Sequence, residues 1–288
     1  MIGRAACRGA ATIVNAIPTG IGAAFGITLE ADAEVKLLKG PVFVQGGHGE
    51  GTALVEGCVR AVLDGAGLKD MGAEVTVESD IPVSRGLKSS SAVSNVVVLA
   101  ATRAAGIPPD DTRVLGTAID ESLRAGVTVT GAFDDASACY FGGAVVTDNR
   151  ARRILSRGNL DPSLSIVIHV PERRITKASV KTLDFGPARP RIEEAIRHAM
   201  AGEYAKAMEI NSRACSEVLG LTEDVAELAR TNGAVASGIS GTGPATVILA
   251  RREDETRLKR MLERKFEGKV LTASVNETPA REVVPRLF

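Results

Sequence analysis

The sequence contains no tryptophan, two tyrosines and seven phenylalanines among its 288 residues. Proteins that bind single-stranded nucleic acid stack bases on aromatic side chains, so this composition disfavours that class. Net charge is also absent, because 35 basic side chains balance 35 acidic ones. A chain without net charge lacks the general electrostatic attraction that holds proteins on nucleic acids or anionic membranes. We therefore expect neither a nucleic-acid partner nor a membrane partner.

Long apolar runs and a cleavable leader are missing as well. The longest apolar stretches fall short of the roughly 20 residues that a transmembrane helix needs. The opening residues, MIGRAACRGAATIVNAIP, show no apolar core followed by a cleavage site, so we expect no signal peptide. These observations predict a protein of the cytoplasm.

Few side chains are available for a structural metal site. The four cysteines are far apart in the sequence and form no CxxC pair: Cys7, Cys58, Cys139 and Cys215. The three histidines show neither HExxH nor HxxxH spacing: His48, His169 and His198. We expect reduced, mostly buried thiols and no zinc site.

What the sequence does contain is an irregular alternation of strand and helix patterns. In the first half, the pattern predicts glycine-punctuated strands, two helices around a half-buried strand, and a third helix after Pro108-Pro109: 1–45, 50–65, 73–79, 96–106 and 112–126. Asp110 or Asp111 can cap the third of these helices. Residues 131–149 read as a loop followed by a hairpin through Gly142-Gly143.

The second half shows the same mixture. It predicts a strand, three helices, a glycine-rich loop, a strand, a helix and a strand: 164–170, 189–201, 203–219, 222–231, 237–245, 246–250, 252–266 and 269–275. The charged and poorly periodic residues 150–160 are the best candidate for a linker. We therefore expect two α+β domains, residues 1–155 and 156–288.

The segment PVSRGLKSSSA, residues 82–92, is the most informative in the chain. It places Gly86 and three serines between a predicted strand and a buried helix. The first turn of a helix has unpaired N–H groups and a partial positive charge, and a glycine lets the backbone approach a phosphate. One serine would suffice as an ordinary helix cap, so the spacing alone leaves both interpretations open. The segment is not a Walker loop, because the chain contains no GxxxxGK[ST].

The same segment resembles the PxxxGLxSSA signature of the GHMP kinases, which are small-molecule kinases. Two further segments occur in the order that the family has. GAFDDA (131–136) is similar to the segment that holds the catalytic aspartate, and SGISGTGPA (237–245) resembles the C-terminal glycine-rich motif. The opening GAATIVNAIPTGIGAAFGITL is most similar to the archaeal-type shikimate kinases. The resemblance spans nearly the whole chain.

The resemblance implies the α+β, two-domain GHMP kinase fold. Its N-terminal domain would be of the ribosomal protein S5 domain 2-like type, its C-terminal domain ferredoxin-like, and ATP would lie between them. It also implies ATP and Mg²⁺ as cofactors and the phosphorylation of shikimate to shikimate 3-phosphate, a step of aromatic amino-acid biosynthesis. Two alternatives stay open: a homoserine kinase or other GHMP kinase, and a catalytically dead nucleotide- or metabolite-binding regulator. The oligomeric state stays open too.

The resemblance also assigns nucleotide-binding residues. They are Pro82, Val83, Ser84, Arg85, Gly86, Leu87, Lys88, Ser89, Ser90, Ser91, Ala92, Gly241 and Gly243. It makes Ser90 one magnesium ligand and places a second, acidic ligand in the helix before the catalytic aspartate. That helix offers Asp120 and Glu121, and a helical wheel puts Glu121 at the edge of the apolar face, so we expect Glu121 to bind the ion.

The resemblance gives Asp134 the role of taking the proton from the accepting hydroxyl, whereas Asp135 stands where asparagine is frequent. Mevalonate kinase-like members place a lysine of the first motif near this aspartate, and this chain has none there. That role is either vacant or filled by Arg4, Arg8, Lys88 or another residue. An acceptor with a carboxylate also predicts an arginine in the pocket. The pair Arg173-Arg174 could supply one, although a surface pair is the simpler interpretation.

Overall fold

The computed structural model describes residues 1–45, 50–128, 130–175 and 177–286, so that His48 lies outside the described residues. A six-stranded sheet forms the first part of the protein, in the order β3-β4-β2-β5-β6 with β1 paired to β2. The long antiparallel pair is β1 (Ile2–Val14) and β2 (Ile21–Lys39). The others are β3 (Val42–Val44), β4 (Met71–Ser79), β5 (Ala144–Asp148) and β6 (Arg153–Gly158).

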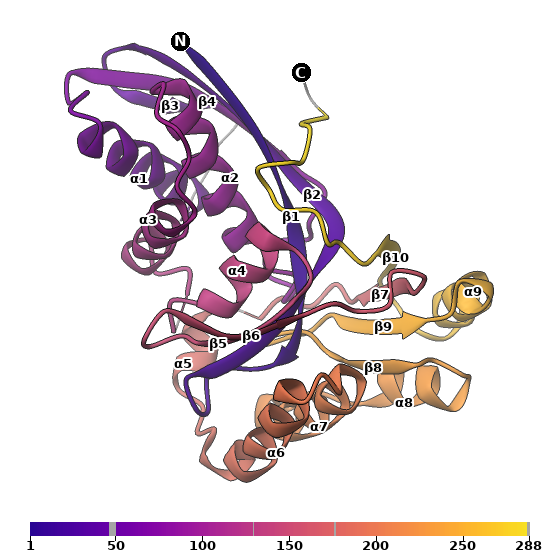
Figure 1. The fold of residues 1–288 in the computed structure, drawn as a ribbon. Coiled ribbons are helices and arrows are strands. Elements are labelled where there is room, and N and C mark those ends of the chain that lie inside the picture. The colour runs from indigo at the N-terminus through magenta and orange to yellow at the C-terminus, as the bar shows by residue number, and fades with distance from the viewer. Residues whose placement is uncertain (46–49, 129, 176, 287–288) are drawn as a thin grey trace.

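Four helices cover one face of this sheet (Figure 1). They are α1 (Glu50–Gly65), α2 (Ser89–Ala104), α3 (Asp111–Arg124) and α4 (Phe133–Phe141). The central one is α2, which packs on β1 and β2 and contacts the other three helices. Its apolar run of valines and alanines is buried for that reason. The side chain of Asp110 caps α3 by accepting a hydrogen bond from the Arg113 N–H.

Helix α4 corrects one expectation, because residues 133–141 were expected to form a loop. The segment FDDASACYF contains no glycine or proline, and its apolar side chains Phe133, Ala136 and Tyr140 recur at helical spacing and are buried. Glycines on both sides, Gly131 and Gly142, make this short helix look like part of a loop in the sequence. The consequence is that both aspartates of GAFDDA lie in the first turn of a helix.

A four-stranded antiparallel sheet in the order β10-β7-β9-β8 forms the second part. Its strands are β7 (Ser165–Val170), β8 (Ala236–Ile239), β9 (Thr246–Ala250) and β10 (Lys269–Ser274). Its helices are α5 (Lys177–Lys181), α6 (Arg189–Met200), α7 (Tyr204–Leu219), α8 (Asp224–Thr231) and α9 (Glu255–Lys265), with short 3₁₀ turns at Gly186–Ala188 and Arg252–Asp254. The architecture is therefore two-domain α+β, as expected.

The expected boundary between residues 155 and 156 falls inside β6. This strand pairs with β5, so the first sheet continues to Gly158. It is an edge strand with exposed arginines, Arg153 and Arg157, which hide its alternation in the sequence.

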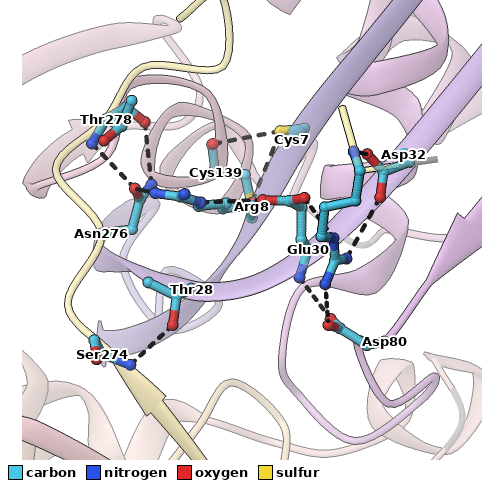
Figure 2. A network of polar contacts seen from close by, with 11 residues as sticks. Cys7, Arg8, Thr28, Glu30, Asp32, Asp80, Cys139, Ser274, Asn276 and Thr278 are labelled. Atoms are coloured by element: carbon cyan, nitrogen blue, oxygen red, sulfur yellow. Dashed lines mark hydrogen bonds and ion pairs between the residues drawn. The ribbon is translucent and has the colours of Figure 1, made fainter. Parts of the chain in front are cut away.

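The C-terminal segment after β10 returns to the first sheet (Figure 1). The Arg8 side chain donates to Asn276 Oδ1 at 2.6 Å. Further along, Arg286 forms ion pairs with Glu30 (2.7 Å) and Asp32 (3.4 Å), two buried acids of β2, in the network that Figure 2 shows. Residues 275–286 thereby tie the two domains together.

The four cysteines are free and buried. Burial raises the pKa of each thiol, that of Cys7 and that of Cys215 to about 12. They are unreactive core residues, as expected. Among the helices of the described residues, none combines the length and the apolarity needed to cross a membrane.

Candidate functional site

The two glycine-rich segments, 82–92 and 237–245, lie against each other. Ser240 Oγ donates to the Gly86 carbonyl at 2.7 Å, and the Ala245 N–H donates to the Arg85 carbonyl at 3.2 Å. Gly86 has a φ of +84°, and a Cβ there would lie 2.0 Å from the Ser240 carbonyl oxygen. Glycine is therefore required at position 86 by the approach of a second backbone as well as by its own conformation.

These segments line a cavity of about 470 Å³, here called the large cavity. Ten of the thirteen expected nucleotide-binding residues line it: Pro82, Val83, Ser84, Gly86, Leu87, Lys88, Ser89, Ser90, Gly241 and Gly243. Leu54 and Val127 add apolar surface to its wall, and Val83 is 63% exposed. An exposed valine beside further apolar side chains is suited to the flat face of a heterocyclic base.

The other three expected residues lie elsewhere. The guanidinium of Arg85 turns toward the C-terminal domain, where it donates to the Glu172 carbonyl at 2.5 Å. Ser91 borders a smaller hollow of about 20 Å³, and Ala92 is fully buried in the core. The structure thus brings most of the expected loop to the large cavity and turns three residues away from it.

The first turn of α2 opens onto the large cavity. Lys88 precedes it in the left-handed conformation (φ 64°), and the helix begins at Ser89 without an acidic residue in its first turn. Free N–H groups at the start of a 16-residue helix, next to the hydroxyls of Ser89 and Ser90, form a site for phosphate oxygens.

Of the two cations in segment 82–92, Lys88 is the one that lines the large cavity. Its side chain is 7% exposed, and Nζ lies 2.8 Å from Asp135 Oδ1. Arg4 pairs with Glu34 and Arg8 with Glu30 on other parts of the sheet. Of the three candidates for the missing first-motif lysine, Lys88 is the one that the structure brings to an aspartate of α4.

Asp134 borders a second, small cavity of about 40 Å³. Hydroxyl and amide side chains supply much of its lining: Thr12, Asn15, Thr128, Thr130 and Thr242. Asp134 itself is 4% exposed. A Cβ at Gly22 would lie 2.3 Å from Asp134 Oδ2, so a side chain at position 22 would displace this carboxylate.

The pKa of Asp134 is raised to about 7. Burial is the largest cause, and the charge of Asp135 adds to it. Lys88 and a hydrogen bond from Asn149 act in the opposite direction. A buried carboxyl with a pKa near neutrality is suited to general acid–base chemistry.

The large and small cavities share Lys88, Asp135, Gly241 and Thr242 as lining residues. An anion held at the start of α2 would therefore lie next to a hydroxyl-bearing molecule held beside Asp134. This arrangement can pass a phosphoryl group from the large cavity to the small one, with a base at the accepting end.

Glu121 lies outside this arrangement. It is buried, as the helical wheel predicts, but its carboxylate binds Arg124 and faces α1, where a Cβ at Gly57 would lie 2.6 Å from Oε2. It is not among the residues that line the cavities bordered by Ser90. Asp120 lies on the surface and pairs with Arg152. The helical wheel correctly predicted that Glu121 lies on the buried face of α3. It could not predict that this face packs on α1 at Glu121.

Some residues of the site were not expected from the sequence. Asn149 contacts Asp134 from the end of β5, where Asp148-Asn149 reads as an ordinary turn. In the part of the chain that the structure describes, no arginine lines either cavity, and the cations that do are Lys88 and Lys181. Arg173 and Arg174 are exposed.

Comparison with known proteins agrees with this geometry. The sequence matches the GHMP kinases N terminal domain over residues 53–143 and GHMP kinases C terminal over residues 192–268. It is 38% identical over 278 residues to a shikimate kinase of Methanothermobacter thermautotrophicus, covering 95% of each chain. It is 40% identical over 285 residues to a shikimate kinase of Methanosarcina acetivorans, covering 96% of this chain and 95% of that one.

Solved structures share the fold. A homoserine kinase from Cytophaga hutchinsonii superimposes with a TM-score of 0.77 at 16% identity, covering 96% of each chain. The mevalonate kinase of Methanococcus jannaschii superimposes with a TM-score of 0.75 at 14% identity, covering 96% of this chain and 98% of that one. At such identities the likeness concerns the fold alone.

Proposed function

The chain belongs to the GHMP kinase family, and on this premise we propose that it transfers the γ-phosphoryl group of ATP to shikimate, giving shikimate 3-phosphate and ADP. The observation that supports the reaction most strongly is the position of Asp134. It is a buried carboxyl with a pKa near neutrality, at a hydroxyl-lined cavity adjoining a phosphate-binding loop. The relatives named as shikimate kinases support this acceptor.

ATP would occupy the large cavity. We assign its triphosphate to the backbone N–H groups from Gly86 to Ser91 and its base to the apolar wall near Val83 and Leu54. The close contact between Gly86 and Ser240 supports a position of the C-terminal domain's loop over the phosphates. Both domains then contribute to one nucleotide site.

Mg²⁺ is the ion that such a reaction uses, and the loop fits it in part. Magnesium prefers oxygen ligands, and the hydroxyl of Ser90 lines the large cavity. When bound, the ion would neutralise charge on the phosphates of ATP. We keep Ser90 as the ligand from this chain. Glu121 would become a second ligand only after leaving Arg124, because its carboxylate binds that arginine and does not line the large cavity.

Shikimate would bind with its accepting hydroxyl in the small cavity, next to Asp134. The threonine and asparagine side chains around it can bond the other hydroxyls of a polyol. Its carboxylate would meet a lysine rather than an arginine, since Lys88 is the cation that lines the small cavity among the described residues.

An assay of ADP release tests the acceptor directly. Shikimate, homoserine and mevalonate are supplied side by side at saturating ATP and Mg²⁺. The proposal predicts ADP release with shikimate and a value of kcat/KM at least about 100-fold lower with the other two, because polar groups built for absent hydroxyls stay unpaired. A preference for homoserine would show that the protein is a homoserine kinase instead. Nucleotide binding without ADP release from any of the three would indicate a regulator.

A further inference from the structure

Asn149 forms two hydrogen bonds with Asp134. Its Nδ2 donates to Asp134 Oδ1 at 2.8 Å, and its Oδ1 accepts from the Asp134 N–H at 3.1 Å. The amide is itself fixed, because Oδ1 also accepts from Thr147 Oγ1 at 2.7 Å and Nδ2 donates to Thr130 Oγ1 at 3.3 Å. Asn149 is 4% exposed, so water does not compete for these bonds.

The two carboxylate oxygens of Asp134 consequently differ. Oδ1 accepts a hydrogen bond from Asn149, whereas Oδ2 lies close to Gly22 and has no side-chain donor among the described residues. The backbone N–H of Asp135 also stabilises the carboxylate. Oδ2 is therefore the oxygen that Asn149 leaves free, on a carboxyl group that lines the small cavity.

We propose that Asn149 is a positioning residue, which holds the Asp134 carboxylate with Oδ1 occupied and Oδ2 free to accept the proton of the acceptor hydroxyl. This inference rests on the proposed phosphoryl transfer. In that step the acceptor oxygen bonds the γ-phosphorus, the bond from phosphorus to the departing ADP oxygen breaks, and the hydroxyl proton moves to Oδ2. A carboxylate free to rotate would present Oδ2 in this place only part of the time.

The hydrogen bonding of Asn149 also affects the pKa of Asp134. The hydrogen bond from Asn149 stabilises the charged carboxylate and lowers the pKa of Asp134 against the effect of burial. The other ionisable groups that act on Asp134 are Asp135 and Lys88, and the thiol of Cys139 lies on the same helix. Losing the Asn149 bond leaves those groups in place, so the pKa of Asp134 must rise.

The test is Asn149→Leu, which keeps the branched shape of the side chain, removes its hydrogen bonds and adds no charge. We expect kcat with shikimate to fall at least about tenfold, while KM for ATP changes by less than about twofold. The acidic limb of the profile of kcat/KM against pH should move to higher pH by about one to two units, as expected for losing a hydrogen bond to a charged group.

A second variant and a control keep the test decisive if Asn149→Leu folds poorly. Thr147→Val removes the hydroxyl that orients the amide and should shift the acidic limb in the same direction by a smaller amount. Asn95→Leu removes another buried asparagine, which donates to the Ala136 carbonyl of α4 at 2.9 Å. This variant should lower Tm without moving the acidic limb, because Asn95 bonds the backbone of α4 and the Cys7 thiol and not Asp134.

Titration of the Asp134 carboxyl carbon by ¹³C NMR, assigned with Asp134→Asn, separates the inference from the proposed function. A higher pKa of Asp134 in Asn149→Leu, measured without any substrate, supports the inference that Asn149 holds the Asp134 carboxylate. An unchanged pKa and pH profile, with only Tm lowered, would make Asn149 structural and overturn the inference. Full activity of Asp134→Asn would instead remove the base on which the proposed mechanism depends.

Discussion

Asp134 and Asp135 are adjacent in the sequence but have different surroundings, because successive side chains of a helix point about 100° apart. Asp134 is held by Asn149 beside the small cavity, whereas Asp135 pairs with Lys88 at the wall between the two cavities. The sequence could offer both as candidates, and only the resemblance preferred the first. The side-chain partners supply a physical reason for the same choice.

A buried base imposes a cost on the fold, and this gives the prediction at the residue scale. The folded-state pKa of Asp134, about 7, lies above its unfolded value of 3.8, so the folded protein binds this proton more tightly. Stability is therefore lost as pH rises from about 4 to about 7. We expect Asp134→Asn, which cannot ionise, to be more stable than the original protein at pH 8.

Urea unfolding of both proteins at pH 5 and at pH 8 measures this difference. The advantage of Asp134→Asn should be smaller at pH 5, where the original carboxyl is largely protonated. An advantage that does not change with pH would mean that Asp134 titrates normally in the folded protein.

At the scale of elements, the contact between the two glycine-rich segments determines what Gly86 does. The sequence explains this glycine by the approach of a phosphate. The structure adds the Ser240 carbonyl, which lies where a side chain at position 86 would be. A substitution would therefore push the segments 82–92 and 237–245 apart, and with them the two walls of the large cavity.

Gly86→Ala should consequently weaken ATP binding at least about tenfold and lower Tm, since alanine adopts a φ of +84° only with strain. Gly116→Ala in α3 is the matched control, because nothing lies within 4 Å of its added Cβ. The control should keep ATP affinity and gain up to about 1 kcal/mol in stability, as alanine is favoured in helices. Calorimetry with ATP and thermal melts check both variants. Unchanged affinity in folded Gly86→Ala would remove this loop from the nucleotide site.

At the scale of the whole molecule, the sequence predicted the elements whose periodicity is strong. The helices α1, α6, α7 and α8 begin and end within about three residues of their expected bounds. The elements it missed are short or at an edge: α4 lies between glycines, and β6 carries arginines on an edge strand. Their formation depends on packing against distant parts of the chain.

In the site, too, the sequence predicted the local features and missed the contacts between distant residues. The loop 82–92 and Asp134 could be singled out from motifs, since each consists of neighbouring residues. The contact of Gly86 with Ser240, 154 positions apart, and the grip of Asn149 on Asp134 could not, because no local pattern specifies them. Glu121 gives a further example, since its burial and its i,i+3 pairing with Arg124 follow from the helical pattern, whereas its position against Gly57 of α1 does not.

The central claim is that Asp134 takes the proton of the accepting hydroxyl, and one kinetic measurement tests it most directly. The turnover number with shikimate at saturating ATP and Mg²⁺ is compared for the original protein, Asp134→Asn and Asp135→Asn. Loss of a general base costs about 10²–10⁴ in rate, so Asp134→Asn should lose at least about 100-fold while binding ATP with unchanged affinity. Asp135→Asn should lose much less. A turnover of Asp134→Asn close to that of the original protein, or a loss confined to Asp135→Asn, would contradict the account.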